Sequence, residues 1–261
     1  NITAIPRSDP ASSTSNEQRG YHHSSFEVTG IFLPQGEEVI VEVEEEPANA
    51  QLMIGQWGQY TGVENITDGK LNFGSGTFKL AKGENRFKNA KTGGMVYINN
   101  LSDTQTLHVK VTGGRKVPLY IQGTTDINEF KTALTNAQDV PFMELVNDKV
   151  IVTTRIDRTK DIFLKGNQAD DFLTYAKEIV DLENQAADLS MEGSHSSKKA
   201  PQRLHIANPT TGAGKFYCTD YFLGIHSEST GDRTVFSSKS GQSSWGLFHE
   251  IGHSYQNPYY T

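Results

Sequence analysis

The sequence WGLFHEIGHSYQ at residues 245–256 contains the pattern His-Glu-x-x-His, formed by His249, Glu250 and His253. On a helix, side chains four residues apart lie on one face, with Cβ atoms about 5–6 Å apart. Two imidazoles at this spacing converge on one metal ion, and neutral imidazole is a preferred ligand of tetrahedral Zn²⁺. The carboxylate of Glu250 can accept a proton from a zinc-bound water without binding the metal itself. The stretch therefore predicts a zinc site with two histidine ligands and a glutamate base.

The alternative interpretation is a solvated surface helix that carries the three residues by coincidence. Chance alone gives this pattern in on the order of one or two in a hundred chains of this size. Leu247, Phe248 and Ile251 are apolar, so we expect a buried helix, in which a glutamate needs a partner. Gly246 and Gly252 each destabilise a helix by about 1 kcal/mol relative to alanine, which suggests that another segment approaches closely. These neighbours favour the metal site.

Length, charge and cysteine content limit the classes of function. The chain has 261 residues, enough for one large domain or two smaller ones, and a formal net charge of −7. Such an acidic chain is a poor match for nucleic acid or for anionic membranes. Cys218 is the single cysteine, which excludes an intrachain disulfide and predicts a small buried side chain rather than a catalytic thiol. No apolar run approaches about 18 residues, so we expect no transmembrane segment.

The first part of the chain has the pattern of an antiparallel β domain. Residues 1–24 are polar and predict an extended or partly ordered lead-in, in which we expect His22 and His23 to be solvated. From residue 25 to about residue 114, short β-type runs alternate with turn signals, as is typical of a β-sandwich. The predicted strands are 38–44, 51–56, 77–80, 95–99 and 107–112, and one predicted turn is Gly83-Glu84-Asn85.

Trp57 and Tyr60 lie in this β region, and the sequence leaves two roles open for them. Their rings could form a stacking platform for a sugar ring. Alternatively they pack in the core or at a domain interface, which the ordinary burial tendency of aromatic side chains favours by about two to one. The β-rich part could accordingly bind sugar or simply support the segment that follows.

From residue 115 to residue 261 helical and β patterns are mixed, which predicts an α+β domain. The expected elements are helices over 126–137 and 167–189 and strands over 149–156 and 203–207. We expect the acidic residues of the long helix, among them Asp170 and Glu183, to form a solvated face. The apolar run over 216–225 predicts an edge strand above the zinc site, to which a peptide substrate could add as a further strand.

Four segments resemble the enhancin-like zinc metallopeptidases (the M60 peptidases), a family that includes mucin-degrading enzymes of host-associated bacteria. They are TGIFLPQGEEVIVEV at 29–43, GGMVYINN at 93–100, VPFMELVNDKVIVT at 140–153 and the 245–256 stretch, which is similar to the family's WGxxHExGHxxQ helix. The resemblance covers most of residues 28–261. It predicts an α+β fold, with an N-terminal antiparallel β-sandwich-like domain over 25–114 followed by the first part of a zincin-type metallopeptidase domain over 115–261.

The resemblance also implies roles for individual residues. His249 and His253 match the family's two zinc-binding histidines, and Glu250 matches its general base. The family's third protein ligand is a glutamate further along the chain, whereas the residues from 254 to 261 include no glutamate or aspartate. We therefore expect a truncated chain, with the third ligand beyond it. Gln256 lies on the histidine face of the helix, seven residues after His249, but glutamine is a poor zinc ligand, so we expect it to support the site rather than bind the metal.

The implied activity is that of a zinc endopeptidase that cleaves mucin-like, O-glycosylated proteins and contacts their glycans. A secreted or cell-surface location is an expectation from the same resemblance. Two alternatives stay open. The first is an inactive or binding-only fragment that adheres to carbohydrate or protein, because its zinc site lacks the third ligand. The second is a peptidase for unglycosylated protein.

Overall fold

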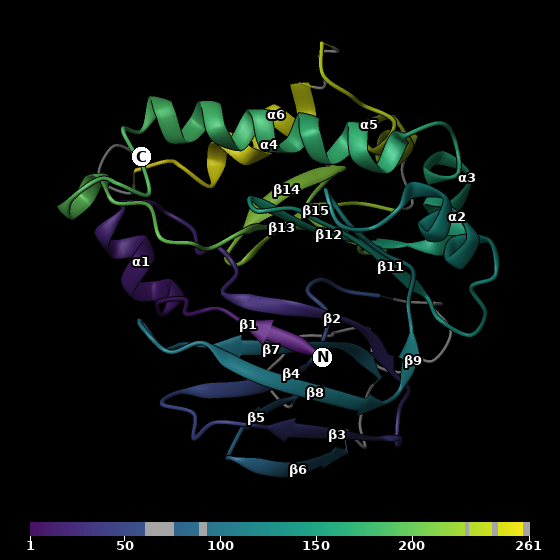
Figure 1. Ribbon diagram of the computed structural model, residues 1–261. Helices are drawn as coiled ribbons and strands as arrows, with labels where there is room; N and C mark the ends of the chain where they lie inside the picture. The colour runs from purple at the N-terminus through teal and green to yellow at the C-terminus, as the bar shows by residue number, and fades with distance from the viewer. Residues whose placement is uncertain (61–75, 89–92, 228–229, 242–244, 258–261) are drawn as a thin grey trace.

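The computed structural model describes residues 1–60, 76–88, 93–227, 230–241 and 245–257, and its strands form three stacked sheets (Figure 1). The first sheet has the order β1 (Ile2–Ala4), β8 (Leu107–Gly113), β3 (Glu38–Val43) and β6 (Gly83–Lys88). The second has the order β5 (Thr77–Lys79), β4 (Ala50–Gly55), β7 (Gly94–Asn100), β2 (Phe26–Leu33) and β9 (Arg115–Lys116). All pairings in both sheets are antiparallel, which confirms the predicted sandwich.

The alternation of side chains along β3 shows how the sequence builds this sandwich. Val39, Val41 and Val43 are buried, whereas Glu38 and Glu42 on the opposite face are exposed. Successive side chains of a strand point to opposite faces, so three valines at every second position cover one face with apolar surface. That face packs against the second sheet, and the buried residues of the two sheets form one continuous core.

The third sheet is mixed and has helices on one face (Figure 1). Its order is β10 (Leu119–Ile121), β11 (Phe142–Val146), β12 (Val150–Arg155), β13 (Leu204–Ala207), β15 (Phe222–Ile225) and β14 (Phe216–Thr219). The covering helices are α2 (Ile127–Thr135), α3 (Ile156–Phe163), α4 (Gln168–Ala186), α5 (Thr230–Phe236) and α6 (Trp245–His253). The predicted α+β fold is therefore confirmed, with antiparallel sheets first and a helix-covered mixed sheet second.

The opposite face of the mixed sheet packs on the β-sandwich, so the molecule has four layers. Phe142 of β11 lies between the ring of Phe32 on β2 and the ring of Tyr60, at centroid distances of 6.3 and 5.1 Å. Tyr60 is fully buried in this interlayer core. Of the two roles open for Tyr60, packing at the domain interface is thus the one the structure shows.

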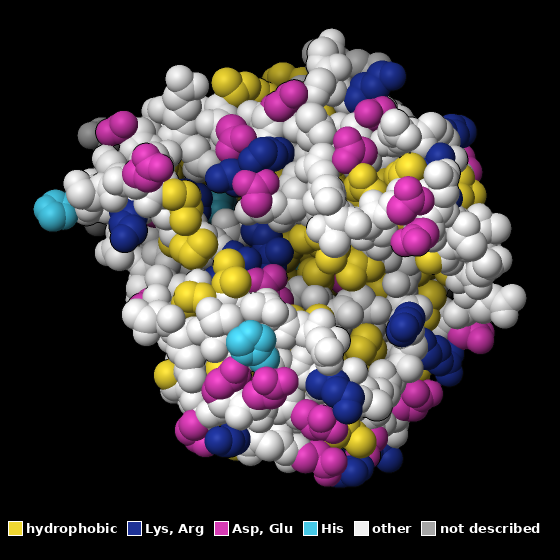
Figure 2. All heavy atoms as spheres, viewed as in Figure 1, with side chains coloured by type: hydrophobic (Ala, Val, Ile, Leu, Met, Phe, Trp, Pro, Cys, Tyr) yellow, Lys and Arg dark blue, Asp and Glu magenta, His cyan; other side chains and the backbone are white. Residues whose placement is uncertain are grey.

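The surface is consistent with an acidic, charge-mixed protein. In Figure 2, acidic side chains accompany the basic ones over the N-terminal sheets, and Arg86 pairs with both Glu38 and Glu84. Among the described residues, no helix is long and apolar enough to cross a bilayer.

The prediction of an extended or partly ordered lead-in over residues 1–24 was wrong. β1 pairs with β8, and helix α1 (Pro10–Asn16) begins at Asp9, whose side chain accepts the N–H of Ser12. The polar residues after α1 are buried because they have charged partners, one nearby in the sequence and one from a distant segment. The Glu17 carboxylate contacts Arg19 at 2.7 Å and Lys199 at 3.3 Å. A polar composition predicts disorder only where such partners are missing.

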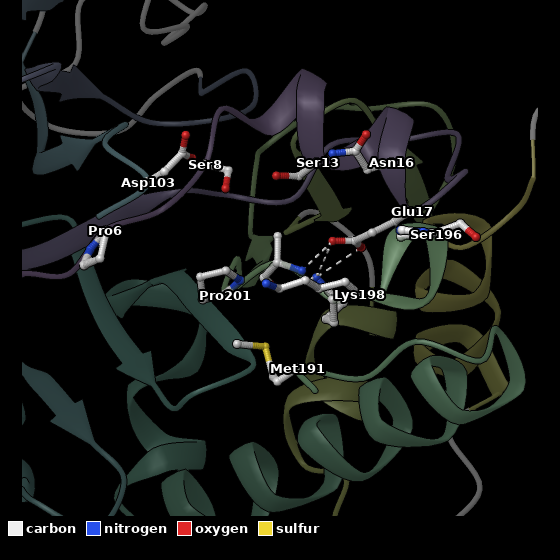
Figure 3. Close-up of a pocket in the computed structure, with 13 residues that line it drawn as sticks. Pro6, Ser8, Ser13, Asn16, Glu17, Asp103, Met191, Ser196, Lys198 and Pro201 are labelled. Atoms are coloured by element: carbon white, nitrogen blue, oxygen red, sulfur yellow. Dashed lines mark hydrogen bonds and ion pairs between the residues drawn. The ribbon is translucent and has the colours of Figure 1, made fainter. Parts of the chain in front are cut away.

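A cavity of about 650 Å³ lies beside this ion cluster, between α1 and the segment containing the short helix η2 (His195–Ser197) (Figure 3). Burial lowers the pKa of Lys199 to about 8, although Glu17 acts in the opposite direction. The charged atoms of Glu17 and Lys199 contact one another and the backbone at Ala200. Because these groups pair with each other, the cluster anchors the N-terminal segment to the loop before β13.

Candidate active site

Helix α6 carries the His-Glu-x-x-His motif and packs against the edge strand β14 and helix α4. Leu247 and Ile251, one turn apart, are buried in the core of the mixed-sheet domain. Gly246 lies against Phe216 of β14, and a Cβ at this glycine would lie 2.9 Å from the phenyl ring. The close approach inferred from the helix glycines is therefore observed at Gly246, where a larger side chain would require the Phe216 ring or the helix to shift.

The expectation of a buried helix was wrong in part, because Trp245 is 73 % and Phe248 is 44 % exposed. The helix lies in the outer layer, so only the stripe formed by Leu247 and Ile251 faces the sheet. The opposite stripe carries the histidines, and Trp245 stacks on His249 with ring centroids 4.4 Å apart. This stacking restricts the rotation of the His249 ring.

The two histidines converge on one point. The Nε2 atoms of His249 and His253 lie 2.9 Å apart. Two zinc–nitrogen bonds of about 2.05 Å at a tetrahedral angle place the nitrogens roughly 3.3 Å apart, so a small outward rotation accommodates one Zn²⁺. Among the described residues, only Glu44, Glu45 and His108 form a group of three potential ligands, and that group lies near the surface, where two residues following β3 meet His108 of β8. The histidine pair has no third ligand from the described part of the chain.

Glu250 lies beside the histidines and is half-buried. Burial raises the pKa of its carboxyl group, whereas the charges of the two histidines and the backbone of Cys218 act in the opposite direction. Cys218 belongs to β14, so the glutamate faces the edge strand. Burial raises the pKa of the Cys218 thiol to about 12, which is unsuitable for a nucleophile and agrees with the prediction of an inert cysteine.

The run 216–225 forms a hairpin rather than one strand, but the predicted edge is present. Thr219 of β14 pairs with Phe222 of β15, leaving Asp220 and Tyr221 as a two-residue turn. Among the described strands, β14 pairs only with β15 and lies at the end of the sheet order. Its outer edge runs past Glu250, where an extended peptide could add as a strand.

Of the acidic residues of α4, Asp170 has a hydrogen-bond partner and Glu183 is half-buried, which corrects the expectation of a purely solvated acidic face. Asp170 accepts a hydrogen bond from the hydroxyl of Tyr120 at 2.9 Å. Glu183 is half-buried next to α6, where its Oε1 lies 3.4 Å from the position of a Cβ on Gly252. Burial raises the pKa of Glu183. Of these two acids, only Glu183 lies against the active-site helix.

The lead-in also reaches the active-site helix, and this corrects the expectation of a solvated His23. The His23 side chain is buried, its Nε2 lies 3.3 Å from the hydroxyl of Ser254, and its ring packs on Tyr255. His22 lies nearer the surface, with Nδ1 3.1 Å from a carboxylate oxygen of Asp220 in the β14–β15 turn. Residues 22 and 23 therefore bridge the end of α6 and the end of the edge strand.

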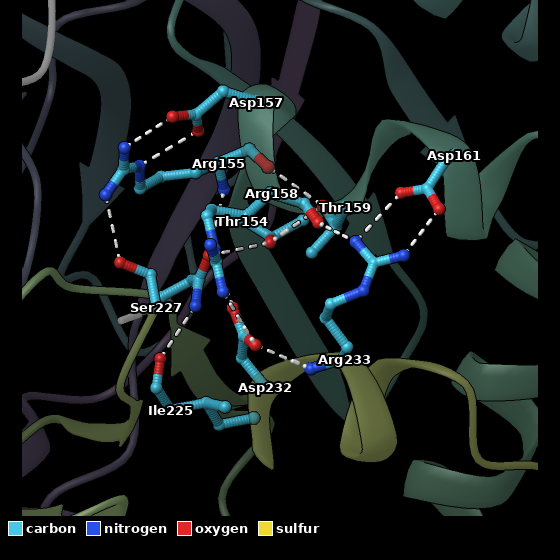
Figure 4. A network of polar contacts seen from close by, with 11 residues as sticks. Thr154, Arg155, Asp157, Arg158, Thr159, Asp161, Ile225, Ser227, Asp232 and Arg233 are labelled. Atoms are coloured by element: carbon cyan, nitrogen blue, oxygen red, sulfur yellow. Dashed lines mark hydrogen bonds and ion pairs between the residues drawn. The ribbon is translucent and has the colours of Figure 1, made fainter. Parts of the chain in front are cut away.

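A network of arginine–aspartate pairs connects α3 to α5, the helix that precedes α6 in the chain (Figure 4). Arg158 of α3 contacts the fully buried carboxylate of Asp232 on α5 at 3.1 Å. Arg233 pairs with Asp161, and Arg155 donates to the hydroxyl of Ser227 at 3.0 Å. The partners are up to 74 residues apart in sequence, so no local pattern could have predicted the network.

Replacing Asp232 with asparagine is expected to lower the free energy of unfolding by about 2 kcal/mol. Removing one member of a buried ion pair typically costs about 3–5 kcal/mol, and the partial exposure of Arg158 reduces this figure. Asp161→Asn is the matched control, because Asp161 pairs with Arg233 and the two side chains are 57 % and 44 % exposed. Chemical denaturation should show a loss below about 0.5 kcal/mol for the control. Equal losses in the two variants would contradict the assigned role of burial.

A two-histidine helix with an intervening glutamate, beside the free edge of a sheet, is the arrangement of a metal-dependent peptidase. Residues 113–261 match the family described as peptidase M60, enhancin and enhancin-like, and residues 10–112 match the N-terminal domain of M60-like peptidases. The chain belongs to this M60 family of metallopeptidases. The resemblance inferred from the sequence is thereby confirmed.

Solved structures have the same fold. A mutant of a functionally unknown conserved protein from Bacillus anthracis is 24 % identical, with a TM-score of 0.85 over 98 % of this chain and 50 % of its own. The M60 catalytic domain of ZmpC from Clostridium perfringens, solved in complex with the sialyl T antigen, is 15 % identical, with a TM-score of 0.77 over 100 % of this chain and 54 % of its own. At these identities the likeness shows the fold alone.

A curated relative is the TRPM8 channel-associated factor homolog of Xenopus laevis. It is 25 % identical over 167 residues, which are 63 % of this chain and 17 % of the relative. The chain thus spans about half the length of the solved structures described above and a smaller part of this relative.

Proposed function

We propose that this chain carries the zinc-binding helix and the substrate-docking edge of an endopeptidase that cleaves mucin-like, O-glycosylated proteins. The observation that carries the proposal is the convergence of the His249 and His253 Nε2 atoms beside Glu250. The complex of the C. perfringens relative with the sialyl T antigen, an O-glycan, supports the glycoprotein substrate. A glutamate beyond His253 as third ligand and a secreted or cell-surface location belong to the same proposal.

In the proposed hydrolysis, the histidines, the edge of β14 and Glu250 have separate roles. Zn²⁺, when bound by His249 and His253, supplies a Lewis acid that polarises the scissile carbonyl and makes water more acidic. The peptide hydrogen-bonds to the outer edge of β14, which holds its backbone extended beside α6. Glu250 accepts the proton of the attacking water and passes it to the nitrogen of the leaving amine. The raised pKa of Glu250 makes its carboxylate a stronger base for accepting that proton.

A second candidate is a fragment that binds glycoproteins without cleaving them. It is favoured by the absence of a third ligand near the histidine pair among the described residues. An O-glycosylated peptide distinguishes the two candidates when it is incubated with the zinc-loaded protein that contains this chain. Cleavage that stops after chelation and returns with Zn²⁺ supports the peptidase, whereas binding of the intact peptide without cleavage supports the second candidate.

His253→Ala is expected to weaken zinc binding by more than about 100-fold. Changing a residue that merely supports a metal ligand commonly costs about 10–100-fold in affinity, so loss of a direct ligand should exceed this. Isothermal titration calorimetry with Zn²⁺ measures the change. His108→Ala is the control, since His108 belongs to the exposed Glu44–Glu45–His108 group, and it should leave the high-affinity site intact. If the His108 variant lost zinc and the His253 variant retained it, the assigned site would be incorrect.

A further inference from the structure

Trp245, the first residue of α6, is a large aromatic residue that the packing of the helix does not explain. It is 73 % exposed, whereas Leu247 and Ile251, which hold α6 against the sheet, are buried. An indole that stays in water contributes little to folding, because the hydrophobic effect depends on the apolar area that is removed from water. Alanine is also the better helix former. The presence of a tryptophan here therefore calls for a reason other than stability.

The indole contacts one of the two histidines of the proposed zinc site. Side chains four residues apart share one face of a helix and lean towards its N-terminus, so the His249 ring lies over the turn that carries Trp245. The two ring centroids are 4.4 Å apart and the ring planes are inclined by 24°. The His253 ring meets the same imidazole at 4.4 Å, with the planes 79° apart. The three rings thus form a stripe along α6 with His249 in the middle.

Hydrogen bonding does not explain the orientation of the His249 ring. A histidine that binds a metal through Nε2 usually donates its Nδ1–H to a carboxylate, a backbone carbonyl or water, and this bond fixes the plane of the ring. Within the described part of the chain, the only polar contact of the His249 side chain joins its Nε2 to that of His253. The final torsion of a histidine side chain is broadly distributed, and His249 is exposed. The indole is therefore the contact that holds the plane of this ring.

We propose that Trp245 is a positioning residue of the metal site, whose indole holds the His249 ring with Nε2 facing the point it shares with His253. A ring that is already restricted loses less conformational entropy when it binds a metal. An imidazole bound to Zn²⁺ also gains positive charge, which the electron-rich face of an indole attracts. Both effects stabilise the metal-bound state. The inference rests on the metal site of the proposed function, but it depends on neither the substrate nor the cleavage step.

Phe248 offers a matched control on the same helix. It is also an exposed aromatic residue, and it directly precedes His249 in the sequence. Residues one position apart on a helix do not face each other, so the Phe248 ring is not placed to stack on the imidazole. Phe248→Ala therefore removes an exposed aromatic ring from α6 and leaves the contact between Trp245 and His249 intact.

Trp245→Ala is expected to weaken zinc binding by about tenfold, the lower end of the range for groups that orient a metal ligand. Isothermal titration calorimetry with Zn²⁺ measures the affinity in the protein that contains this chain. Trp245→Phe keeps an aromatic face and should recover most of the loss, and Phe248→Ala should bind zinc within about twofold of the parent. The thermal midpoint of metal-free Trp245→Ala should stay within about 2 °C of the parent, because the residue is exposed.

A second measurement needs no metal. Protons that lie over an aromatic face resonate upfield in NMR spectra, so the ring protons of His249 should move downfield in metal-free Trp245→Ala. They should keep their positions in Phe248→Ala. The signals are identified by their loss in His249→Ala. This readout reports the stacked ring directly, whatever the affinity for zinc.

Unchanged zinc affinity in Trp245→Ala would overturn the inference, and so would an equal loss of affinity in Phe248→Ala. A raised KM for peptide cleavage at saturating zinc, with zinc affinity unchanged, would make Trp245 a substrate contact instead. A parent protein that binds no zinc would overturn the metal site of the proposed function as well. The failure of the inference alone is therefore distinguishable from the failure of the proposed function.

Discussion

Glu250→Gln is expected to lower the rate of peptide cleavage by about a hundred- to ten-thousandfold, while zinc affinity changes little. Glutamine has the size of glutamate but cannot accept the proton of the attacking water, and general base catalysis commonly contributes a factor of this size. Because Glu250 is not a proposed ligand, His249 and His253 still converge in the variant. Cleavage of an O-glycosylated peptide by the protein that contains this chain measures the rate, and calorimetry measures the metal affinity.

Glu183→Gln is the matched control for this prediction. Glu183 is a second half-buried acid next to α6, and burial raises its pKa as it does that of Glu250. It lies beside Gly252 rather than facing the edge strand β14. The control should therefore keep most of the cleavage rate. A large loss of cleavage in Glu183→Gln together with normal cleavage in Glu250→Gln would mean that the general base lies on α4 and not on α6.

The second large effect is expected at Glu144, a fully buried glutamate of β11 in the layer between the β-sandwich and the mixed sheet. The hydroxyls of Tyr97 and Thr153 donate to its Oε1 at 2.8 and 3.2 Å. Its Oε2 makes no hydrogen bond within the described part of the chain. Burial raises the pKa of Glu144 to about 7, against a usual value of 4.5, although these hydrogen bonds act in the opposite direction.

The sign of the effect on stability follows from proton binding. Between pH 4.5 and 7 the folded protein holds a proton on Glu144 that the unfolded chain releases. The resulting stabilisation is complete below pH 4.5 and is lost as the pH rises through 7. A difference of 2.5 pKa units corresponds to about 3 kcal/mol, at about 1.36 kcal/mol per unit. The charged carboxylate should therefore weaken the interlayer contact at alkaline pH.

Glu144→Gln is expected to remove this dependence, because glutamine resembles the protonated acid at every pH. Relative to the parent, the variant should gain about 3 kcal/mol between pH 4.5 and pH 8, measured by urea unfolding at several pH values. Burial lowers the pKa of His205 to about 3, so His205 adds stability as the pH rises from 3 to 6.5. It does so in both proteins, and the difference between them removes its contribution.

Glu38→Gln controls for the general effect of removing one negative charge, since Glu38 is exposed on β3 and pairs with Arg86. It should leave the slope of stability against pH unchanged over this range. Parallel pH profiles for the parent and Glu144→Gln would show that Glu144 is ionised in the folded protein even below pH 7.

Where the signal is local, the sequence predicts the structure well. The strand predicted over 38–44 is observed as β3, and the helix predicted over 126–137 is observed as α2, which begins after Asp126. The β14–β15 turn was not anticipated, because Tyr221 occupies a position where glycine or asparagine is the usual signal. The first three residues of β6, Gly83 to Asn85, were predicted as a turn. The residues of this strand lack apolar alternation, and the strand pairs with β3.

The helix with His249, Glu250 and His253 was determined by the sequence itself, because residues four apart on any helix share one face. Only the tertiary structure decided that His23 would reach Ser254, that Asp232 would be buried against Arg158, and that Trp57 would stack on Tyr221. The physical reason is that sequence periodicity relates only residues one helical turn apart, or two positions apart along a strand. Burial and ion pairing depend on segments that meet only after the sheets have stacked, and no local pattern encodes those contacts.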